Sequence, residues 1–166
     1  MKPIVITGFM GCGKTRVARE LARRLDVVMI DLDEQIVERT GRTPAQLIVE
    51  EGESAFRAIE SEALSEVLQN GAARVIALGG GAWIQSVNRE LIEQYDCLSV
   101  WLDVPFETCW SRIRASDEDR PLGRTHDQAL VLFHQRRPIY QLAQVHLTIR
   151  EENFADLVAR ITHFIR

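Results

Sequence analysis

Short apolar runs rich in β-branched residues alternate with longer amphipathic stretches along the whole chain, and this alternation constrains the fold more than any other feature. The apolar runs predict strands at residues 3–7, 27–30, 74–78, 97–102 and 145–149. Strands separated by helices are typical of βαβ units, in which helices cover both faces of a parallel sheet. The sequence therefore predicts an α/β fold of three layers, with a central parallel sheet of about five strands flanked by helices.

Between and after these runs, apolar side chains recur at helical spacing. Helices are expected at residues 14–25, 34–40, 45–69 (with a break at Gly52), 107–114 and 126–142, and a last helix closes the chain. The polar segment 115–125, which contains proline and glycine, is expected to be a loop. There is no repeat and no linker, and 166 residues are the size of one domain, so we expect a single domain spanning 1–166.

The first loop carries the pattern G-x-x-x-x-G-K-[ST], directly after a strand and directly before a helix. It runs from Gly8 to Lys14 and Thr15. Glycines let backbone N–H groups turn inward around phosphate oxygens, the lysine reaches the β- and γ-phosphates, and the hydroxyl is a ligand for Mg²⁺. A simple glycine-rich turn is the alternative. Of 20 cationic side chains only two are lysines, so this internal lysine is informative. We predict a nucleoside triphosphate site, with ATP and Mg²⁺ as its ligands.

Two carboxylates, Asp31 and Asp33, follow the second predicted strand. Residues two apart on an extended chain face the same way, so both can face one cleft. One would hold Mg²⁺, and the other would orient or deprotonate the hydroxyl of a second substrate. The alternative is that the pair caps the following helix, and Asp33 can serve both purposes.

Composition excludes several classes of protein. The net charge of −4 argues against general nucleic-acid binding. Three cysteines without a close pair predict neither a zinc site nor a disulfide framework, and the four histidines show no metal spacing. No apolar run approaches the roughly 20 residues of a membrane span. We therefore expect a cytoplasmic protein with no membrane or nucleic-acid partner.

Four further groups of residues have side chains or bare backbone that suit an anionic ligand. Residues 52–57 (GESAFR) with Glu60 place an arginine and a glutamate on one helical face, and residues 79–81 are three glycines. Residues 120–122 (RPL) lie in the polar loop, and residues 136–140 (RRPIY) lie on the late helix. Taken separately, each has a simple structural explanation, such as a surface ion pair or a turn.

Taken together, the phosphate loop, D-x-D, G-E-x-x-F-R-x-x-E, G-G-G, R-P-L and R-x-P-x-Y occur in the order and at intervals that resemble the shikimate kinase family. The resemblance covers nearly the whole chain, from Pro3 to the last strand. It implies a P-loop NTPase fold like that of the nucleoside monophosphate kinases, with a substrate-binding region at about 33–61 and a mobile lid at about 112–125. It also implies transfer of the ATP γ-phosphoryl group to the 3-hydroxyl of shikimate, and we expect a monomer.

The resemblance also implies a role for each matched position. Shikimate would be bound by Asp33, Arg57, Gly79, Gly80, Gly81 and Arg136. The nucleotide would be bound by Gly11, Cys12, Gly13, Lys14, Thr15 and Arg120. Catalysis would rest on Lys14, Asp33 and Arg120, with the last coming from the lid to the transferring phosphoryl group.

The resemblance implies three further roles, for a metal site, a supporting glutamate and an adenine contact. Mg²⁺ would be held by Thr15 and Asp31. Glu60 would hold the arginine of its own motif in place, and either Arg112 or Arg114 would stack on adenine.

Two positions near the acceptor site depart from the family pattern. Ile48 stands where an aromatic residue is usual, and Trp83 stands where a smaller aliphatic residue is usual. Two other functions stay open: a related kinase of another small metabolite, such as gluconate, and a nucleotide-binding module without turnover. The motif around Arg57 favours shikimate over the first, and intact Asp33, Lys14 and Arg120 argue against the second.

Overall fold

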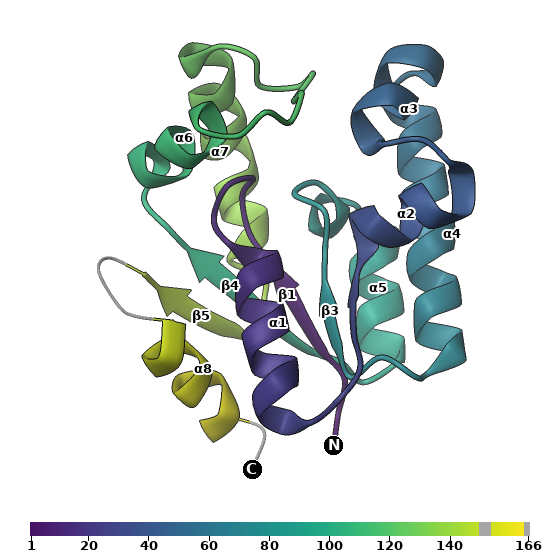
Figure 1. The fold of residues 1–166 in the computed structure, drawn as a ribbon, viewed down its shortest axis with the longest axis vertical. Helices are drawn as coiled ribbons and strands as arrows, with labels where there is room; N and C mark the ends of the chain where they lie inside the picture. The colour runs from purple at the N-terminus through teal and green to yellow at the C-terminus, as the bar shows by residue number, and fades with distance from the viewer. Residues whose placement is uncertain (150–153, 165–166) are drawn as a thin grey trace.

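One parallel sheet forms the centre of the protein. The computed structural model describes residues 1–149 and 154–164, and in this part of the chain five strands pair in the order β2-β3-β1-β4-β5 (Figure 1). Every pairing is parallel. The strands are β1 (Ile4–Thr7), β2 (Met29–Asp31), β3 (Val75–Ala77), β4 (Leu98–Asp103) and β5 (Val145–Thr148). The predicted α/β fold and its parallel sheet are confirmed.

Helices connect the strands and cover both faces of the sheet. They are α1 (Lys14–Leu25), α2 (Leu32–Thr40), α3 (Pro44–Glu51), α4 (Glu53–Asn70), η1 (Ala82–Ile84, a short 3-10 helix), α5 (Ser86–Gln94), α6 (Phe106–Arg114), α7 (His126–Tyr140) and α8 (Phe154–His163). Helices α1 and α8 pack together on one face (Figure 1). Helices α4, α5 and α7 form the other layer and contact one another through η1 or directly. The four residues of β1 are buried in the middle.

Several predicted boundaries agree with the structure because the sequence carries their local signals. Helix α1 has the predicted bounds. The predicted break at Gly52 separates α3 from α4, because this glycine adopts φ 91°, ψ 160°, a conformation that cannot continue a helix. The second strand begins at Met29, later than predicted, and ends at Asp31. The loop at 115–125 contains no helix or strand.

Helix α5 and the 3-10 turn before it lie in a stretch for which the sequence pattern predicts no element. The fully buried residues of α5 are Asn88 and Ile92, so a polar residue takes one of its most inward positions and hides the helical spacing. The Asn88 amide has a structural partner, because its Nδ2 donates to the Ala82 carbonyl at 2.9 Å. This bond ties α5 to the turn that follows the third strand.

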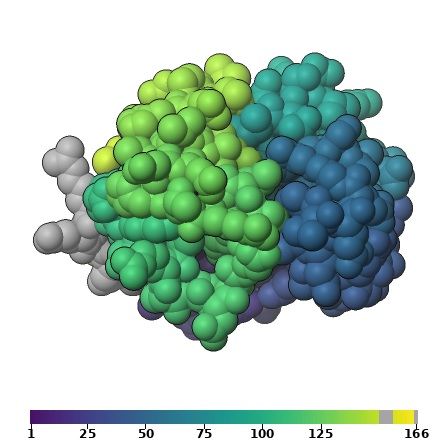
Figure 2. Space-filling view, turned by 90° about the horizontal axis from the view of Figure 1, so that it is seen from above, coloured from purple at the N-terminus to yellow at the C-terminus, as the bar shows by residue number. Residues whose placement is uncertain are grey.

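Two groups of helices rise above the carboxyl ends of the strands and face each other. One is formed by α2 and α3, and the other by α6, α7 and the loop at 115–125 (Figure 1). Seen from above, they meet over the sheet edge at which parallel α/β folds bind ligands (Figure 2). Within the residues that the structure describes, no helix combines the length and the apolar character needed to cross a membrane.

Candidate active site

The glycine-rich loop between β1 and α1 leaves several backbone N–H groups available to a ligand. Within the described residues, the amides of Gly11, Gly13 and Lys14 donate to no protein acceptor. The α1 N-terminus follows directly, since Gly13 is its N-cap and provides no side-chain bond. Such a helix N-terminus attracts anions through its free amides and its dipole. The loop is therefore preformed to receive phosphate oxygens.

The lysine of this loop is folded back over the loop's own carbonyl groups. Lys14 Nζ donates to the carbonyl oxygens of Gly8 and Phe9, each at 3.0 Å. It also lies 3.9 Å from Cys12 Sγ, and Cys12 itself is buried. These contacts are local, so the ammonium group can exchange them for phosphate oxygens without unpacking the core.

The two aspartates at and just after the end of β2 are not arranged as the sequence predicts. Helix α2 begins at Leu32, so Asp31 and Asp33 do not lie two apart on an extended strand. Asp31 is the N-cap: its Oδ1 accepts from the amides of Asp33 and Glu34, at 3.0 and 3.5 Å. The capping role proposed for Asp33 is therefore wrong, because the strand turns into a helix one residue earlier. Asp31 Oδ2 also accepts a hydrogen bond from Thr15 Oγ1 at 2.5 Å.

A small cavity of about 100 Å³ lies beside the phosphate loop, and it gathers residues from distant parts of the chain. Its lining includes all the predicted acceptor-binding positions and the lid arginine: Asp33, Arg57, Gly79, Gly80, Gly81, Arg120 and Arg136. Met10 from the phosphate loop lines the same cavity, and so does Ile48. The motifs that are scattered in the sequence therefore converge on one space next to the phosphate loop.

Arginine and glutamate side chains from α4 form the buried charge cluster of this cavity. Arg57 Nη1 donates to Glu60 Oε2 at 2.7 Å, and Arg57 Nη2 lies 3.2 Å from Glu53 Oε1. Glu60 is fully buried, and its other oxygen, Oε1, has no hydrogen-bond partner among the residues that the structure describes. Burial raises the pKa of Glu60, although the neighbouring Arg57 guanidinium lowers it. The predicted contact between these two residues is present in the structure.

Two glycines of the triplet, Gly79 and Gly81, have no room for a side chain because neighbouring side chains lie close to them. A Cβ at Gly79 would lie 2.7 Å from Asp33 Oδ1 and 2.8 Å from Glu60 Oε1. A Cβ at Gly81 would overlap the Arg57 guanidinium. The amides of all three glycines donate to no protein acceptor in the described part of the chain. The triplet thus offers bare N–H groups at the wall of the cavity.

Asp33 is half-buried in the cavity, where its carboxyl group has a strongly altered pKa. Burial, together with the nearby carboxylates of Asp31 and Glu60, raises this pKa to about 7, even though the charges of Lys14 and Arg120 lower it. A carboxyl group that titrates near neutral pH is suited to accept a proton during catalysis.

The lid arginine reaches the cavity from the loop at 115–125. Arg120 forms an ion pair with Glu118 at 2.5 Å, and its buried Nε has no partner. The loop packs on the phosphate loop at Gly123, where a Cβ would lie 2.8 Å from Met10 Cε. The glycine therefore permits close contact between lid and phosphate loop.

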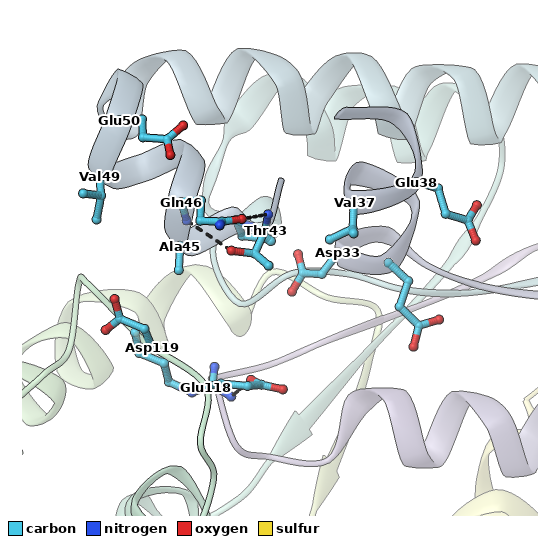
Figure 3. A pocket seen from close by; sticks show the side chains of 13 residues that line it. Asp33, Val37, Glu38, Thr43, Ala45, Gln46, Val49, Glu50, Glu118 and Asp119 are labelled. Atoms are coloured by element: carbon cyan, nitrogen blue, oxygen red, sulfur yellow. Dashed lines mark hydrogen bonds and ion pairs between the residues drawn. The ribbon is translucent and has the colours of Figure 1, made fainter. Parts of the chain in front are cut away.

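A larger hollow of about 790 Å³ opens outward from the same residues, between α2–α3 and the lid (Figure 3). It shares Asp33, Pro44, Ala45, Asp119 and Arg120 with the small cavity, so the two lie next to each other. Its outer rim carries further acidic side chains, namely Glu34, Glu38, Glu50 and Glu118. The small cavity thus lies at the inner end of an open groove.

Three residues near the site have contacts that the sequence does not predict. Trp83 is buried and lies outside the cavity lining, and its Nε1 donates to the Ile139 carbonyl at 2.9 Å. Arg112 Nη1 donates to the Gly11 carbonyl at 3.2 Å, so it braces the phosphate loop. Tyr140 donates to the Gly80 carbonyl. The spacing of Tyr140 four residues after Arg136 is a signal that could have paired them on one helix face.

Comparison with known proteins gives consistent matches over the full chain. The family described as shikimate kinase matches residues 10–166. A shikimate kinase of Moorella thermoacetica is 40% identical over 98% of this chain and 94% of its own length. A crystal structure entitled "Shikimate kinase from Acinetobacter baumannii in complex with shikimate" matches 99% of this chain and 93% of that one, with 33% identity and a TM-score of 0.91. A gluconokinase of Sinorhizobium meliloti, at 14% identity and a TM-score of 0.62, shares the fold alone.

Proposed function

The chain belongs to the shikimate kinase family, a family of P-loop kinases that are ATP-dependent phosphotransferases, and from this premise we propose how its residues carry out the transfer. The substrate is shikimate, whose 3-hydroxyl oxygen attacks the γ-phosphorus of ATP. The bond from that phosphorus to the oxygen bridging to the β-phosphorus breaks, and ADP leaves. The convergence of Asp33, Arg57, Arg136 and three unpaired glycine amides beside the phosphate loop carries the proposal.

The phosphate loop would bind the triphosphate through backbone amides of residues 11–15. Lys14 would leave the carbonyls of Gly8 and Phe9 for the β- and γ-phosphate oxygens, where its charge offsets the charge that moves during transfer. Cys12 would contribute its backbone N–H, which donates to the Phe9 carbonyl at 3.2 Å and would have to leave it for a phosphate oxygen, since the side chain is buried. Arg112, which holds the Gly11 carbonyl, would keep the loop in this conformation.

Thr15 and Asp31 fit a site for Mg²⁺ at the end of β2. Their oxygens lie 2.5 Å apart, at the mouth of the phosphate loop. Mg²⁺ prefers oxygen ligands, retains several waters and is usually bound by one or two protein oxygens together with phosphate oxygens. We propose that these two residues hold the metal, directly or through water. When bound, Mg²⁺ would neutralise charge that develops on the phosphoryl oxygens.

Groups at opposite ends of the cavity would orient the acceptor. The guanidinium groups of Arg57 and Arg136, with amides of the glycine triplet, would bind its carboxylate, because arginine pairs with carboxylates through two parallel hydrogen bonds. Asp33 would accept the hydrogen bond of the attacking hydroxyl and then its proton. Its pKa, which burial and the neighbouring carboxylates raise to about 7, makes it a sufficient base near neutral pH.

Arg120 would act on the transferring group after the lid closes. Glu118, the partner of Arg120 in its ion pair, is exposed to solvent, so breaking the pair costs little free energy. The guanidinium would then stabilise the charge on the γ-phosphoryl oxygens, as arginine fingers do. In this proposal the chain is one domain, with residues 33–61 binding the acceptor and residues 112–125 forming the lid.

An assay of ADP release with Mg-ATP and different acceptors tests the function. We expect turnover with shikimate and little or none with gluconate or nucleoside monophosphates. Phosphorus NMR of the product should show the phosphate ester on the 3-hydroxyl. Turnover of gluconate with shikimate inert would overturn the acceptor assignment. ATP binding without turnover of any of these acceptors would instead favour a nucleotide-binding module.

A further inference from the structure

Helix α7 contacts the glycine triplet through two side chains that share one acceptor. The Gly80 carbonyl accepts a hydrogen bond from the Tyr140 hydroxyl at 2.5 Å and another from Arg136 Nη1 at 3.3 Å. The two donors lie four residues apart on α7, which places them on one face of the helix. Tyr140 therefore satisfies this carbonyl with the shorter bond, while the arginine makes only a weak contact with it.

The direction of this carbonyl determines where the next amide points. The Gly80–Gly81 peptide is trans, so its C=O and its N–H point to opposite sides of the peptide plane. With the C=O directed at α7, the Gly81 N–H is directed away from α7. Both glycines line the cavity, and the Gly81 amide has no acceptor among the described residues. The bond from Tyr140 thus fixes the orientation of an unpaired donor of the site.

The tyrosine itself is held in a rigid environment. Its side chain is buried, and its ring stacks on Trp101 of β4, with the ring centroids 6.2 Å apart. The Arg137 guanidinium lies over the Trp101 ring and also forms an ion pair with Asp103 at 2.7 Å. Burial raises the pKa of Tyr140, so its hydroxyl keeps its proton and stays a donor.

We propose that Tyr140 is a positioning residue for the acceptor, because its hydroxyl fixes the Gly80–Gly81 peptide and frees Arg136 to bind the acceptor carboxylate. This rests on the proposed function. When the acceptor binds, Arg136 turns from the Gly80 carbonyl to the carboxylate, and the carbonyl keeps Tyr140 as its partner. Without the hydroxyl, the same step leaves a partly buried carbonyl with no protein donor among the described residues, which raises the cost of acceptor binding. Tyr140 therefore lowers the cost of acceptor binding without touching the acceptor.

The test is Tyr140→Phe, which keeps the ring and its stacking and removes only the hydroxyl. We expect the KM for shikimate to rise about tenfold, the scale of an orphaned buried hydrogen-bonding group. The KM for ATP and the kcat should stay close to those of the wild type, because the lost interaction is with the bound acceptor. Tyr95→Phe is the matched control: Tyr95 is the other tyrosine of the chain, lies at the end of α5 outside the cavity lining, and should change neither KM.

An uncharged acceptor separates positioning from a structural role. With the methyl ester of shikimate, the ratio of KM values between Tyr140→Phe and wild type should fall toward one, since no carboxylate draws Arg136 away. An unchanged shikimate KM in Tyr140→Phe would overturn the proposal. An equal rise of the KM for ATP, or the same ratio with the ester, would also overturn it, since either indicates a general distortion.

Nitrogen-15 NMR of the wild type tests the proposal even if Tyr140→Phe does not fold. The Gly81 amide signal should move on addition of shikimate and not on addition of its methyl ester. An unmoved Gly81 signal at saturating shikimate would overturn the proposal. If the wild type does not phosphorylate shikimate at all, the proposed function fails. If it does and the Gly81 or KM test is negative, only the role of Tyr140 fails.

Discussion

The phosphate loop and the acceptor cavity lie side by side but are built in different ways. The loop is one continuous segment, residues 8–15, held between the buried strand β1 and helix α1. The cavity takes its charged groups from α2, α4, α7 and the lid, and its bare backbone from the turn after β3. A local motif therefore specifies the first site, whereas the second exists only when distant segments pack correctly.

The two regions also differ in how their charges are balanced. In the loop, one lysine and several backbone amides create a positive potential. Carbonyl groups of the same loop partly offset it by accepting hydrogen bonds from the lysine. In the cavity, the carboxylate of Glu60, with that of Asp31 beside the phosphate loop, raises the pKa of Asp33, and the charges of Lys14 and Arg120 offset them. Changes in the loop should therefore act on the transfer step, and changes in the cavity on acceptor binding and on stability.

The largest effect is expected in the loop, from Lys14→Ala. Its ammonium serves the charge that develops on the phosphates, so kcat should fall by about 10²–10³-fold. The melting temperature should change little, because Lys14 contacts only loop carbonyls and Cys12. Lys2→Ala is the matched control, since Lys2 is the other lysine and pairs with Asp96 on the surface. Near-normal turnover of Lys14→Ala would contradict the assignment of the phosphate site.

In the cavity, Arg57→Ala and Arg136→Ala should act mainly on acceptor affinity. A hydrogen bond to a charged group contributes roughly 1.5–3 kcal/mol, so shikimate should bind about tenfold to a hundredfold more weakly in each variant. ATP affinity should be retained, which calorimetry can measure separately for the two ligands. Arg39→Ala is the control, because Arg39 pairs with Glu62 and Glu66 at the surface. Unchanged shikimate affinity in both variants would remove the two arginines from the site.

Asp33→Asn sharpens the comparison because stability and catalysis should change in opposite directions. The folded-state pKa of Asp33, about 7, is above its ordinary 3.8, so the folded protein binds more protons than the unfolded chain between these pH values. Stability contributed by this group is therefore present at low pH and is lost as pH rises toward 7. At pH 8 the ligand-free wild type carries the buried charge, and the asparagine removes it.

The melting temperature of Asp33→Asn at pH 8 should exceed that of the wild type by a few degrees, since each kcal/mol corresponds to about 2–4 °C in a domain of this size. The difference should shrink at pH 5, where the wild-type carboxyl is protonated, and turnover should be lost at both pH values. Asp117→Asn, at an exposed lid position, should follow the wild type throughout. A lower melting temperature for Asp33→Asn at pH 8 would contradict the raised pKa.

The sequence predicts those parts of the molecule whose signals are local. The bounds of α1 and the break at Gly52 follow from spacing and from a single glycine, and both are confirmed. Helix α5 is missed because the inward residue Asn88 bonds to a carbonyl outside the helix, a partner that no local pattern reveals. The sequence offers capping by the pair Asp31 and Asp33 as an alternative, but it does not show that Asp31 is the cap, because that depends on where the second strand turns into a helix.

The acceptor cavity could be predicted only from the order of several motifs together. Each motif alone has a simple structural explanation, and only packing brings Arg57 of α4 and Arg136 of α7 to the same cavity. The hydrogen bonds that support the wall of the cavity are even harder to predict from the sequence. Tyr140 belongs to the motif R-x-P-x-Y, in which the sequence assigns it no specific contact, and its hydrogen bond to Gly80 spans 60 positions. Long-range polar contacts of this kind leave no periodic signal.

The smallest effect on turnover is expected from Trp83→Val, in the 3-10 helix that follows the glycine triplet. Sequence comparison with the family places Trp83 near the acceptor, but its buried indole lies outside the cavity lining and joins η1 to α7 at Ile139. The KM for shikimate should therefore rise only about two- to threefold, equivalent to less than about 1 kcal/mol. The lost packing should instead lower the melting temperature by several degrees, as large-to-small substitutions in a core do.

Trp83→Phe separates the two contributions of this side chain, because it keeps an aromatic ring and removes the N–H donor. Since Ile139 directly precedes Tyr140, losing the bond to its carbonyl should loosen α7 slightly against the glycine triplet. We expect Trp83→Phe to reproduce most of the small change in KM with less of the loss in melting temperature. A tenfold rise in the shikimate KM of Trp83→Val, with kcat and the KM for ATP unchanged, would instead place the indole in contact with the acceptor. The boundary of the cavity would then have to include η1.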